Sequence, residues 1–175
     1  YKGNDRYYPK HEKGRTMTEI THNLFIGDDS DCGYGAFTYI IHACKTCHQS
    51  ALGYRGSLQS SHQNYLIYER GSNLYLNMVD MERELLPQYT NPIIIVAMRF
   101  IEDHIEEHKI LVHCNQGFSR SPSIALLYCT RSKIIPSTSY QEAVSKFIEL
   151  YPMYNPGRGV AQYLEHNFSN LLGNP

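Results

Sequence analysis

The run KILVH at residues 109–113 constrains the possible folds of this chain more than any other feature. A short apolar strand of this kind, buried on both faces, is typical of the centre of a parallel sheet. The segment before it has apolar residues spaced by four, three and four positions, at Ile94, Met98, Ile101 and Ile105. This spacing predicts the buried face of a helix. A helix followed by a buried strand indicates an α/β fold.

Three more strands are predicted ahead of that helix. They are short runs rich in β-branched or aromatic residues and bounded by turn residues, at 23–27, 38–43 and 74–79. Residues 48–73 are rich in Ser, Gly, Gln, Asn and Tyr and predict a long irregular loop. A loop of that length in a compact domain is often functional.

Helix signals recur along the second half of the chain. Asn91 fits a helix cap and Pro92 the first helical position, so the helix is predicted to begin there. The segment PSIALLYCTRS at 122–132 predicts a buried helix. Ser139 and Glu142 have the spacing of a capping box.

A final helix is predicted over residues 159–172. The order of three strands, a helix, a strand and three helices predicts an α/β fold with a mainly parallel central sheet and helices on both faces. Residues 1–16 carry many charges and little periodicity, which predicts a flexible or surface-draped arm. Residues 17–175 are expected to form a single domain, whose oligomeric state the sequence leaves open.

Composition argues against several classes of binding partner and against a membrane-spanning or secreted protein. The formal net charge is -1, so neither nucleic acid nor an anionic membrane is expected as a partner. No apolar run approaches the roughly 18 residues of a membrane span. The sequence shows no secretory signal, and its five cysteines are an odd number, which favours reduced thiols over a secreted disulfide framework. A cytoplasmic location is therefore expected.

The stretch HCNQGFSRSPS, from residue 113 to 123, carries the chemistry. It follows the buried strand, where ligands bind in open α/β sheets. Its backbone N–H groups and the next helix N-terminus favour an anion, and Gly117 permits the positive φ of such a cradle. Arg120 offers a fork for two phosphate oxygens. The same surroundings favour the thiolate form of Cys114, which makes a nucleophile the better interpretation than an inert buried thiol.

The stretch VHCNQGFSRSPSIAL resembles the signature of the cysteine-dependent dual-specificity protein phosphatases, a branch of the protein tyrosine phosphatase superfamily. The resemblance is sharp over residues 110–128 and extends loosely over about 150 residues. It implies a phosphocysteine intermediate, no metal or other cofactor, and a shallow pocket for phosphotyrosine and phosphoserine or phosphothreonine. The expected partner is a phosphorylated protein or peptide.

The loop residues have expected roles of their own. Ser121 is expected to hydrogen-bond the sulfur of Cys114 and to help it leave. His113 is expected to fix the geometry of the loop without contacting the substrate. Phosphate binding is expected from the residues between the cysteine and the arginine, which are Asn115, Gln116, Gly117, Phe118 and Ser119.

Hydrolysis of a phosphate ester also requires a general acid for the leaving oxygen. The resemblance implies an acid from a loop ahead of the cysteine, and Asp80 is the only aspartate in residues 32–102. It ends a predicted strand 34 residues ahead of Cys114. Glu82 and Glu84 are the fallback acids.

Two other functions fit the same motif. One is a phospho-binding pseudophosphatase module that recognises phosphate without turnover. The other is a phosphatase for phosphoinositides or RNA 5′ ends. Residues 115–119 contain no lysine, whereas phosphoinositide-directed relatives tend to carry lysines there, and the balanced charge indicates no track for a polyanion.

The segment HACKTCH gathers four ligand-type residues, His42, Cys44, Cys47 and His48. Its C-x-x-C-H pattern matches haem attachment, and the whole set suggests zinc. A redox pair that regulates Cys114 is a third possibility. The favoured interpretation is a strand end with two small buried thiols, since haem attachment needs an export route and a closed zinc site needs well-spaced ligands.

Overall fold

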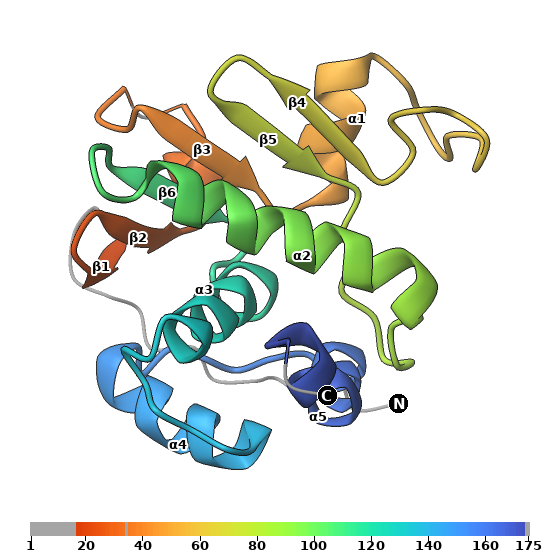
Figure 1. Ribbon diagram of the computed structural model, residues 1–175. Coiled ribbons are helices and arrows are strands. Elements are labelled where there is room, and N and C mark those ends of the chain that lie inside the picture. Colours follow the sequence, from red (N-terminus) through yellow and green to blue (C-terminus); the bar gives the residue numbers. More distant parts are fainter. Residues whose placement is uncertain (1–16, 34, 174–175) are drawn as a thin grey trace, which may run out of the picture.

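A six-stranded sheet forms the centre of the chain in the computed structural model, which describes residues 17–33 and 35–173 (Figure 1). The strand order is β1-β2-β6-β3-β5-β4. The strands are β1 (Thr18–Thr21), β2 (Leu24–Gly27), β3 (Tyr39–His42), β4 (Ile67–Arg70), β5 (Asn73–Leu76) and β6 (Ile110–His113). The four inner strands run parallel, and β1 and β4 pair antiparallel at the two edges. The predicted mainly parallel sheet is confirmed.

Strand β6 lies between β2 and β3, and all four of its residues are buried. Val112 is level with Ile26 on one side and with Ile41 on the other. The apolar run therefore fills the middle of the sheet, as its sequence predicts. The chain leaves the carboxyl end of β6 between the ends of two parallel neighbours, which is where open α/β sheets bind ligands.

Helices cover both faces of the sheet (Figure 1). They are α1 (Lys45–Leu52), α2 (Pro87–His104), α3 (Arg120–Arg131), α4 (Tyr140–Leu150) and α5 (Arg158–Leu171), with a short 3₁₀ turn η1 at Asp29–Asp31. Helices α2 and α3 pack on one face, α4 and α5 extend the layer behind α3, and α1 packs alone against β4 and β5 on the other. Every helix found among the described residues is too short or too polar to span a membrane.

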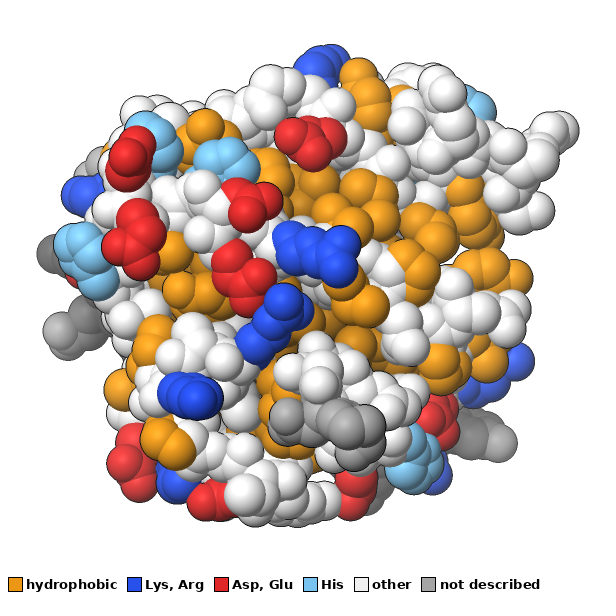
Figure 2. Space-filling view, in the orientation of Figure 1, with side chains coloured by type: hydrophobic (Ala, Val, Ile, Leu, Met, Phe, Trp, Pro, Cys, Tyr) orange, Lys and Arg blue, Asp and Glu red, His pale blue; other side chains and the backbone are white. Residues whose placement is uncertain are grey.

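Helix α2 confirms the predicted buried face but not the predicted start. Ile94, Met98 and Ile101 are fully buried, and acidic side chains gather over the C-terminal end of the helix (Figure 2). The helix begins at Pro87, because this proline already suits the first helical position. Asn91 does not cap it; its side chain accepts a hydrogen bond of 2.6 Å from the Tyr163 hydroxyl of α5.

The predicted loop over 48–73 was wrong in part, since it contains regular structure at both ends. Helix α1 covers its first residues, and the hairpin of β4 and β5 begins at Ile67. The interpretation of 42–48 as a strand end holds only as far as His42, where β3 ends. The sequence of α1 is polar, so hydrophobic periodicity does not predict this helix. It is held in place by its buried His48, which forms hydrogen bonds with Tyr54 and Asn64. Strand β1 was also missed.

The remaining predicted helices are confirmed with small shifts. Helix α3 begins at Arg120, two residues before the predicted start. Ser139 caps α4 by accepting a 3.3 Å hydrogen bond from the Glu142 amide. The Glu142 carboxylate accepts from the amide of Thr138 instead of Ser139, so only half of the capping box forms. The arm predicted at 1–16 lies outside the described residues.

Replacing Ile101 by Ala should lower the free energy of unfolding by about 2–5 kcal/mol, because it leaves a cavity where α2 meets the core. Asp103→Ala, an exposed change in the same turn, is the matched control and should change it by less than about 0.5 kcal/mol. Urea denaturation measures both values. Equal effects for the two variants would contradict the buried face of α2.

Candidate active site

The loop from residue 114 to 119 joins the end of β6 to the start of α3. His113, the last residue of β6, is level with Gly27 of β2 and His42 of β3. Its carbonyl accepts a hydrogen bond of 2.8 Å from the Ala43 amide. The residue that follows, Cys114, is buried at 2% exposure. The sheet therefore fixes the position of this cysteine from both sides.

Ser121 lies beside the sulfur in the first turn of α3. Its hydroxyl is 3.2 Å from Cys114 Sγ and 3.4 Å from the carbonyl oxygen of Gly27. Both side chains are buried at the N-terminal end of a helix, whose positive end favours negative charge. The structure thus brings the predicted cysteine and serine together at the N-terminal end of α3.

Gly117 turns the loop in a conformation that favours glycine, with φ of +73°. A Cβ atom at this position would lie 3.2 Å from the carbonyl oxygen of Gly27. The Gly117 carbonyl accepts a hydrogen bond of 2.9 Å from the Tyr151 hydroxyl. Burial raises the pKa of Tyr151, and the nearby charges of Cys114 and two aspartates raise it further, so this hydroxyl stays protonated and keeps donating.

Arg120 is held at the other end of the loop by neutral acceptors. Its guanidinium donates to the carbonyl of Met78 at 3.1 Å and to the Asn115 side-chain oxygen at 2.8 Å. Its Nε is buried and has no hydrogen-bond partner among the described residues. A guanidinium has five N–H donors, so Arg120 keeps capacity for an anion in the loop.

Asp80 reaches the rim of this loop through Gly157. The Gly157 amide donates to the Ser119 hydroxyl at 2.9 Å. A Cβ atom on Gly157 would lie 2.0 Å from Asp80 Oδ1, so the carboxylate packs where only glycine leaves room. The segment around Gly157 is also bonded to the loop through Asn155, whose amide donates to the Phe118 carbonyl at 2.9 Å.

The two fallback acids lie further along the same segment. Glu84 binds His166 of α5, with 2.8 Å between Oε1 and Nδ1, and Glu82 is exposed. Backbone hydrogen bonds of Gly159 with Met81 and Leu85 anchor the segment to the start of α5. Of the three candidate acids, Asp80 is thus the one that packs against Gly157, the residue that is hydrogen-bonded to the loop.

The remaining loop residues differ in exposure. Gln116 is exposed, Phe118 is half-buried and Ser119 is buried. The side-chain Nδ2 of Asn115 donates to the Thr46 hydroxyl at 3.1 Å, which joins the loop to α1.

The zinc ligands suggested for HACKTCH do not come together as a set. His48 turns away to Tyr54 and Asn64, and Cys44 is the buried residue that precedes α1. His42 and Cys47 instead meet Cys32 and His113, and the four ligand atoms lie within 4.8 Å of one another. Sequence reasoning missed this cluster because it spans residues 32 to 113. The one available signal was that His113 ends one predicted strand and His42 is the last residue but one of another.

Comparison with solved structures identifies the fold. DUSP15 aligns with a TM-score of 0.61 and 20% identity over 90% of this chain and 92% of its own. The human tyrosine phosphatase-like serine/threonine/tyrosine-interacting protein aligns at 0.64 and 21%, over 89% and 97%. A leucine rich repeat and phosphatase domain containing protein from Entamoeba histolytica aligns at 0.61 and 16%, over 89% and 92%.

No protein-family model and no curated protein matches the sequence. The similarity to the solved structures is one of fold, and it covers most of the chain and of each structure. The chain therefore has the fold of the dual-specificity phosphatases, which is the fold that the signature around Cys114 implies.

Gly117→Ala should destabilise the chain more than Gly53→Ala. Both glycines have φ of +73°, so each substitution costs about 1–2 kcal/mol in backbone strain. Only at Gly117 does the new Cβ meet a neighbour, the Gly27 carbonyl, which should add about 1 kcal/mol or more. Urea denaturation of both variants measures the difference, and equal losses would refute the close approach of the loop to β2.

Proposed function

We propose that the chain is a cysteine-dependent phosphatase that hydrolyses phosphotyrosine and phosphoserine or phosphothreonine in proteins. One observation carries the proposal: the buried thiol of Cys114 and the guanidinium of Arg120, with its unpartnered Nε, share one loop at a helix N-terminus. Oriented N–H groups and a positive helix end bind phosphate in other proteins by the same physical means. The fold of the dual-specificity phosphatases supports this assignment.

In the first step, the Cys114 thiolate attacks phosphorus in line with the ester oxygen. An S–P bond forms while the P–O bond to the substrate breaks. Arg120 and the loop amides hold the equatorial oxygens as charge shifts in the transition state. Asp80 gives its proton to the departing oxygen, so the alcohol or phenol leaves neutral.

In the second step, water attacks the phosphorus of the phosphocysteine. The Asp80 carboxylate takes a proton from that water, the P–S bond breaks, and inorganic phosphate forms. The hydroxyl of Ser121, which lies 3.2 Å from Cys114 Sγ, donates a hydrogen bond to the sulfur as it regains its negative charge. The enzyme then returns to its starting state.

A groove beside the loop is an argument for a protein as the substrate. It has a volume of about 260 Å³ and is lined by mainly apolar residues that include Tyr65, Met78, Met81, Leu85 and Tyr89. The Met78 carbonyl also binds Arg120, so the groove begins next to the phosphate loop. Apolar walls suit the side chains that flank a phosphorylated residue better than they suit a polyanion.

A phospho-binding module is the second candidate. The similarity to a protein named as phosphatase-like supports it, since one fold can carry different functions. Its binding would use the same loop amides and Arg120, without turnover. A turnover assay with p-nitrophenyl phosphate separates it from the enzyme.

Cys114→Ser should lower kcat on p-nitrophenyl phosphate by about 10⁴-fold or more, because the nucleophile is lost. The variant should still bind a phosphopeptide, since Arg120 and the loop amides remain. Steady-state kinetics and calorimetric titration measure the two effects. Cys129→Ala, at a buried thiol near the far end of α3, is the matched control and should keep its activity.

Retained turnover by Cys114→Ser would end the proposal. Phosphopeptide binding by a wild-type chain that has no turnover would establish the phospho-binding module instead.

Asp80→Asn should reduce kcat by about 10²–10⁴-fold on phenyl phosphate, whose leaving group needs a proton. The reduction should be smaller on p-nitrophenyl phosphate, which leaves readily as an anion. Glu82→Gln and Glu84→Gln are matched controls from the same segment and should leave both rates near wild type. An unchanged rate for Asp80→Asn, with a loss in either control, would move the acid role to that glutamate.

A further inference from the structure

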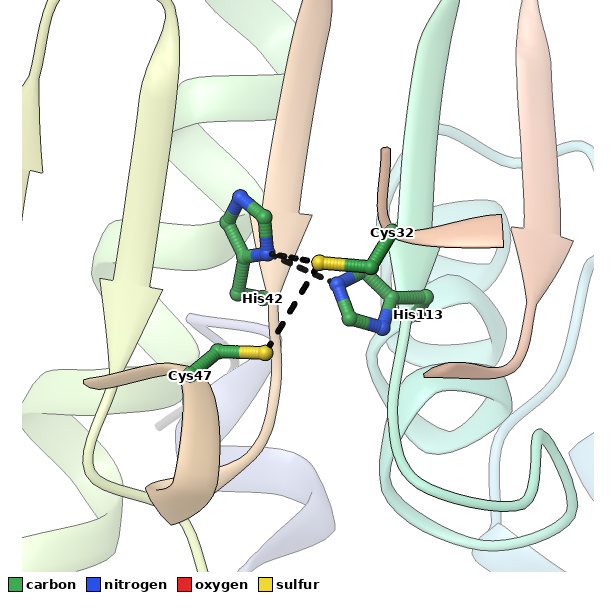
Figure 3. Close-up of side chains that lie close together, drawn as sticks. All are labelled: Cys32, His42, Cys47 and His113. Atoms are coloured by element: carbon green, nitrogen blue, oxygen red, sulfur yellow. Dashed lines mark hydrogen bonds between the residues drawn. The ribbon is translucent and has the colours of Figure 1, made fainter. Parts of the chain in front are cut away.

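A cluster of two thiols and two imidazoles lies behind the phosphate loop, formed by Cys32, His42, Cys47 and His113 (Figure 3). Cys32 Sγ is 3.4 Å from His42 Nδ1 and 3.9 Å from Cys47 Sγ. His113 Nε2 is 2.7 Å from His42 Nδ1. Figure 3 shows the two sulfurs and these two nitrogens turned toward one another.

The four side chains come from four separate segments of the fold. His42 and His113 end the adjacent parallel strands β3 and β6, where they are level with each other and so point to the same face. Cys32 follows the short turn after β2, and Cys47 lies in the first turn of α1. The topology therefore brings these residues together at the carboxyl edge of the sheet.

The neighbours of His42 fix which of its nitrogens faces the cluster. His42 Nε2 is 2.9 Å from the side-chain oxygen of Asn73, an acceptor, so Nε2 carries the proton. The lone pair of Nδ1 then points into the cluster. The ring also stacks on Tyr75, with centroids 4.3 Å apart and an interplanar angle of 9°. Metal-bound histidines are oriented in this way by a partner on the opposite nitrogen.

The atoms that face one another in this cluster include few good hydrogen-bond donors. His42 Nδ1 and His113 Nε2 share one short contact, and the other nitrogen of the buried His113 ring, Nδ1, faces away from the cluster (Figure 3) and has no hydrogen-bond partner among the described residues. Thiols are weak donors and acceptors, so the two cysteines provide little compensation for buried imidazoles. Two imidazole nitrogens and two sulfurs that converge in this way are the donor set of a structural zinc ion.

We propose that Cys32, His42, Cys47 and His113 form a tetrahedral zinc site. Zn–S bonds of about 2.3 Å and Zn–N bonds of about 2.05 Å place tetrahedral ligand atoms about 3.8 Å apart for two sulfurs, 3.6 Å for sulfur and nitrogen, and 3.3 Å for two nitrogens. The observed 3.9 Å and 3.4 Å agree with the first two values. The two nitrogens, 2.7 Å apart, would separate by about 0.6 Å on binding.

An ion has a route to these ligands from the surface. A cavity of about 250 Å³ is lined by Cys32, His42 and Cys47 together with residues of α1, β4 and β5. Cys32 and Cys47 are both partly exposed. Zinc can therefore enter after the chain has folded, and its binding releases the two thiol protons.

Four protein ligands make a closed site, which indicates a structural metal with no open position for chemistry. It would connect the ends of β3 and β6 to α1 and to the turn after β2. His113 directly precedes Cys114, so the ion would stabilise the edge of the sheet that carries the phosphate loop. The site does not depend on the proposed phosphatase activity, because none of its ligands touches the reacting atoms.

Cobalt titration of the full chain under reducing conditions tests the site, because Co²⁺ reports both tetrahedral geometry and thiolate ligands by its absorption. We expect about one Co²⁺ per chain, with thiolate-to-cobalt charge transfer, and competition by Zn²⁺. Cys32→Ser/Cys47→Ser should abolish the charge-transfer band and raise Kd at least about 100-fold. Asn73→Ala keeps all four ligands and should raise Kd about 10–100-fold.

The matched controls are Cys44→Ala, Cys129→Ala and Cys114→Ser, which remove the other three cysteines of the chain. Each should bind cobalt as the wild type does, and circular dichroism checks that every variant is folded. Absence of the charge-transfer band in the wild type would overturn the proposal, as would its loss in Cys114→Ser or Cys44→Ala. A disulfide between Cys32 and Cys47 that persists under the reducing conditions of the titration, detected by mass spectrometry, would also overturn the proposal, because it removes both thiolates.

Discussion

The parallel pairing of β6 with β2 on one side and β3 on the other is the constraint on which the rest of the structure depends. It buries the whole of β6 and ends it at the carboxyl edge of the sheet, where α3 begins after a six-residue loop. Because the strand cannot shift without moving both neighbours, the positions of Cys114 and of the α3 N-terminus are set by the core. Gly117 allows the loop to approach the backbone of β2 closely, because a Cβ atom there would meet the Gly27 carbonyl. The buried centre of the sheet thus supports the residues to which we assign the chemistry.

Groups from distant segments complete the site around that edge. Met78 and Asp80 follow β5, and Gly157 precedes α5. Met78 accepts a hydrogen bond from Arg120, Gly157 donates one to Ser119, and Asp80 packs against Gly157, so these segments are joined to the loop. The cluster of Cys32, His42, Cys47 and His113 lies at the same edge, and one of its members, His113, directly precedes Cys114 in the sequence. A phosphate loop with a metal site behind it would therefore share the carboxyl ends of β3 and β6.

The sequence predicts those parts of the fold in which local pattern and tertiary packing agree. The apolar run of β6 and the spacing of Ile94, Met98 and Ile101 reflect burial directly. Helix α1 and strands β1 and β4 have no comparable pattern, since the helix is polar and both strands lie at sheet edges. The start of α2 was missed because Asn91 and Pro92 carry local signals that Pro87 and the contact with α5 override.

The candidate site likewise contains residues whose proximity the local sequence predicts and contacts that it does not predict. Cys114, Arg120 and Ser121 lie within eight residues, so their spacing alone predicts that they meet. The contact of Asp80 with Gly157 joins positions 77 residues apart, and no local pattern shows it. The HACKTCH segment contains only two of the four clustered ligands, because His113 enters through the strand pairing and Cys32 through the turn after β2.

Catalysis by the proposed mechanism requires that Cys114 form a covalent bond to phosphorus during turnover. Acid quenching of the wild-type chain during the reaction with a phosphopeptide, followed by peptide mass spectrometry, detects this bond. We expect a transient phosphoryl group on the peptide that contains Cys114, which disappears when the substrate is exhausted. Turnover with no phosphoryl group on this peptide, or with one on another residue, would contradict it.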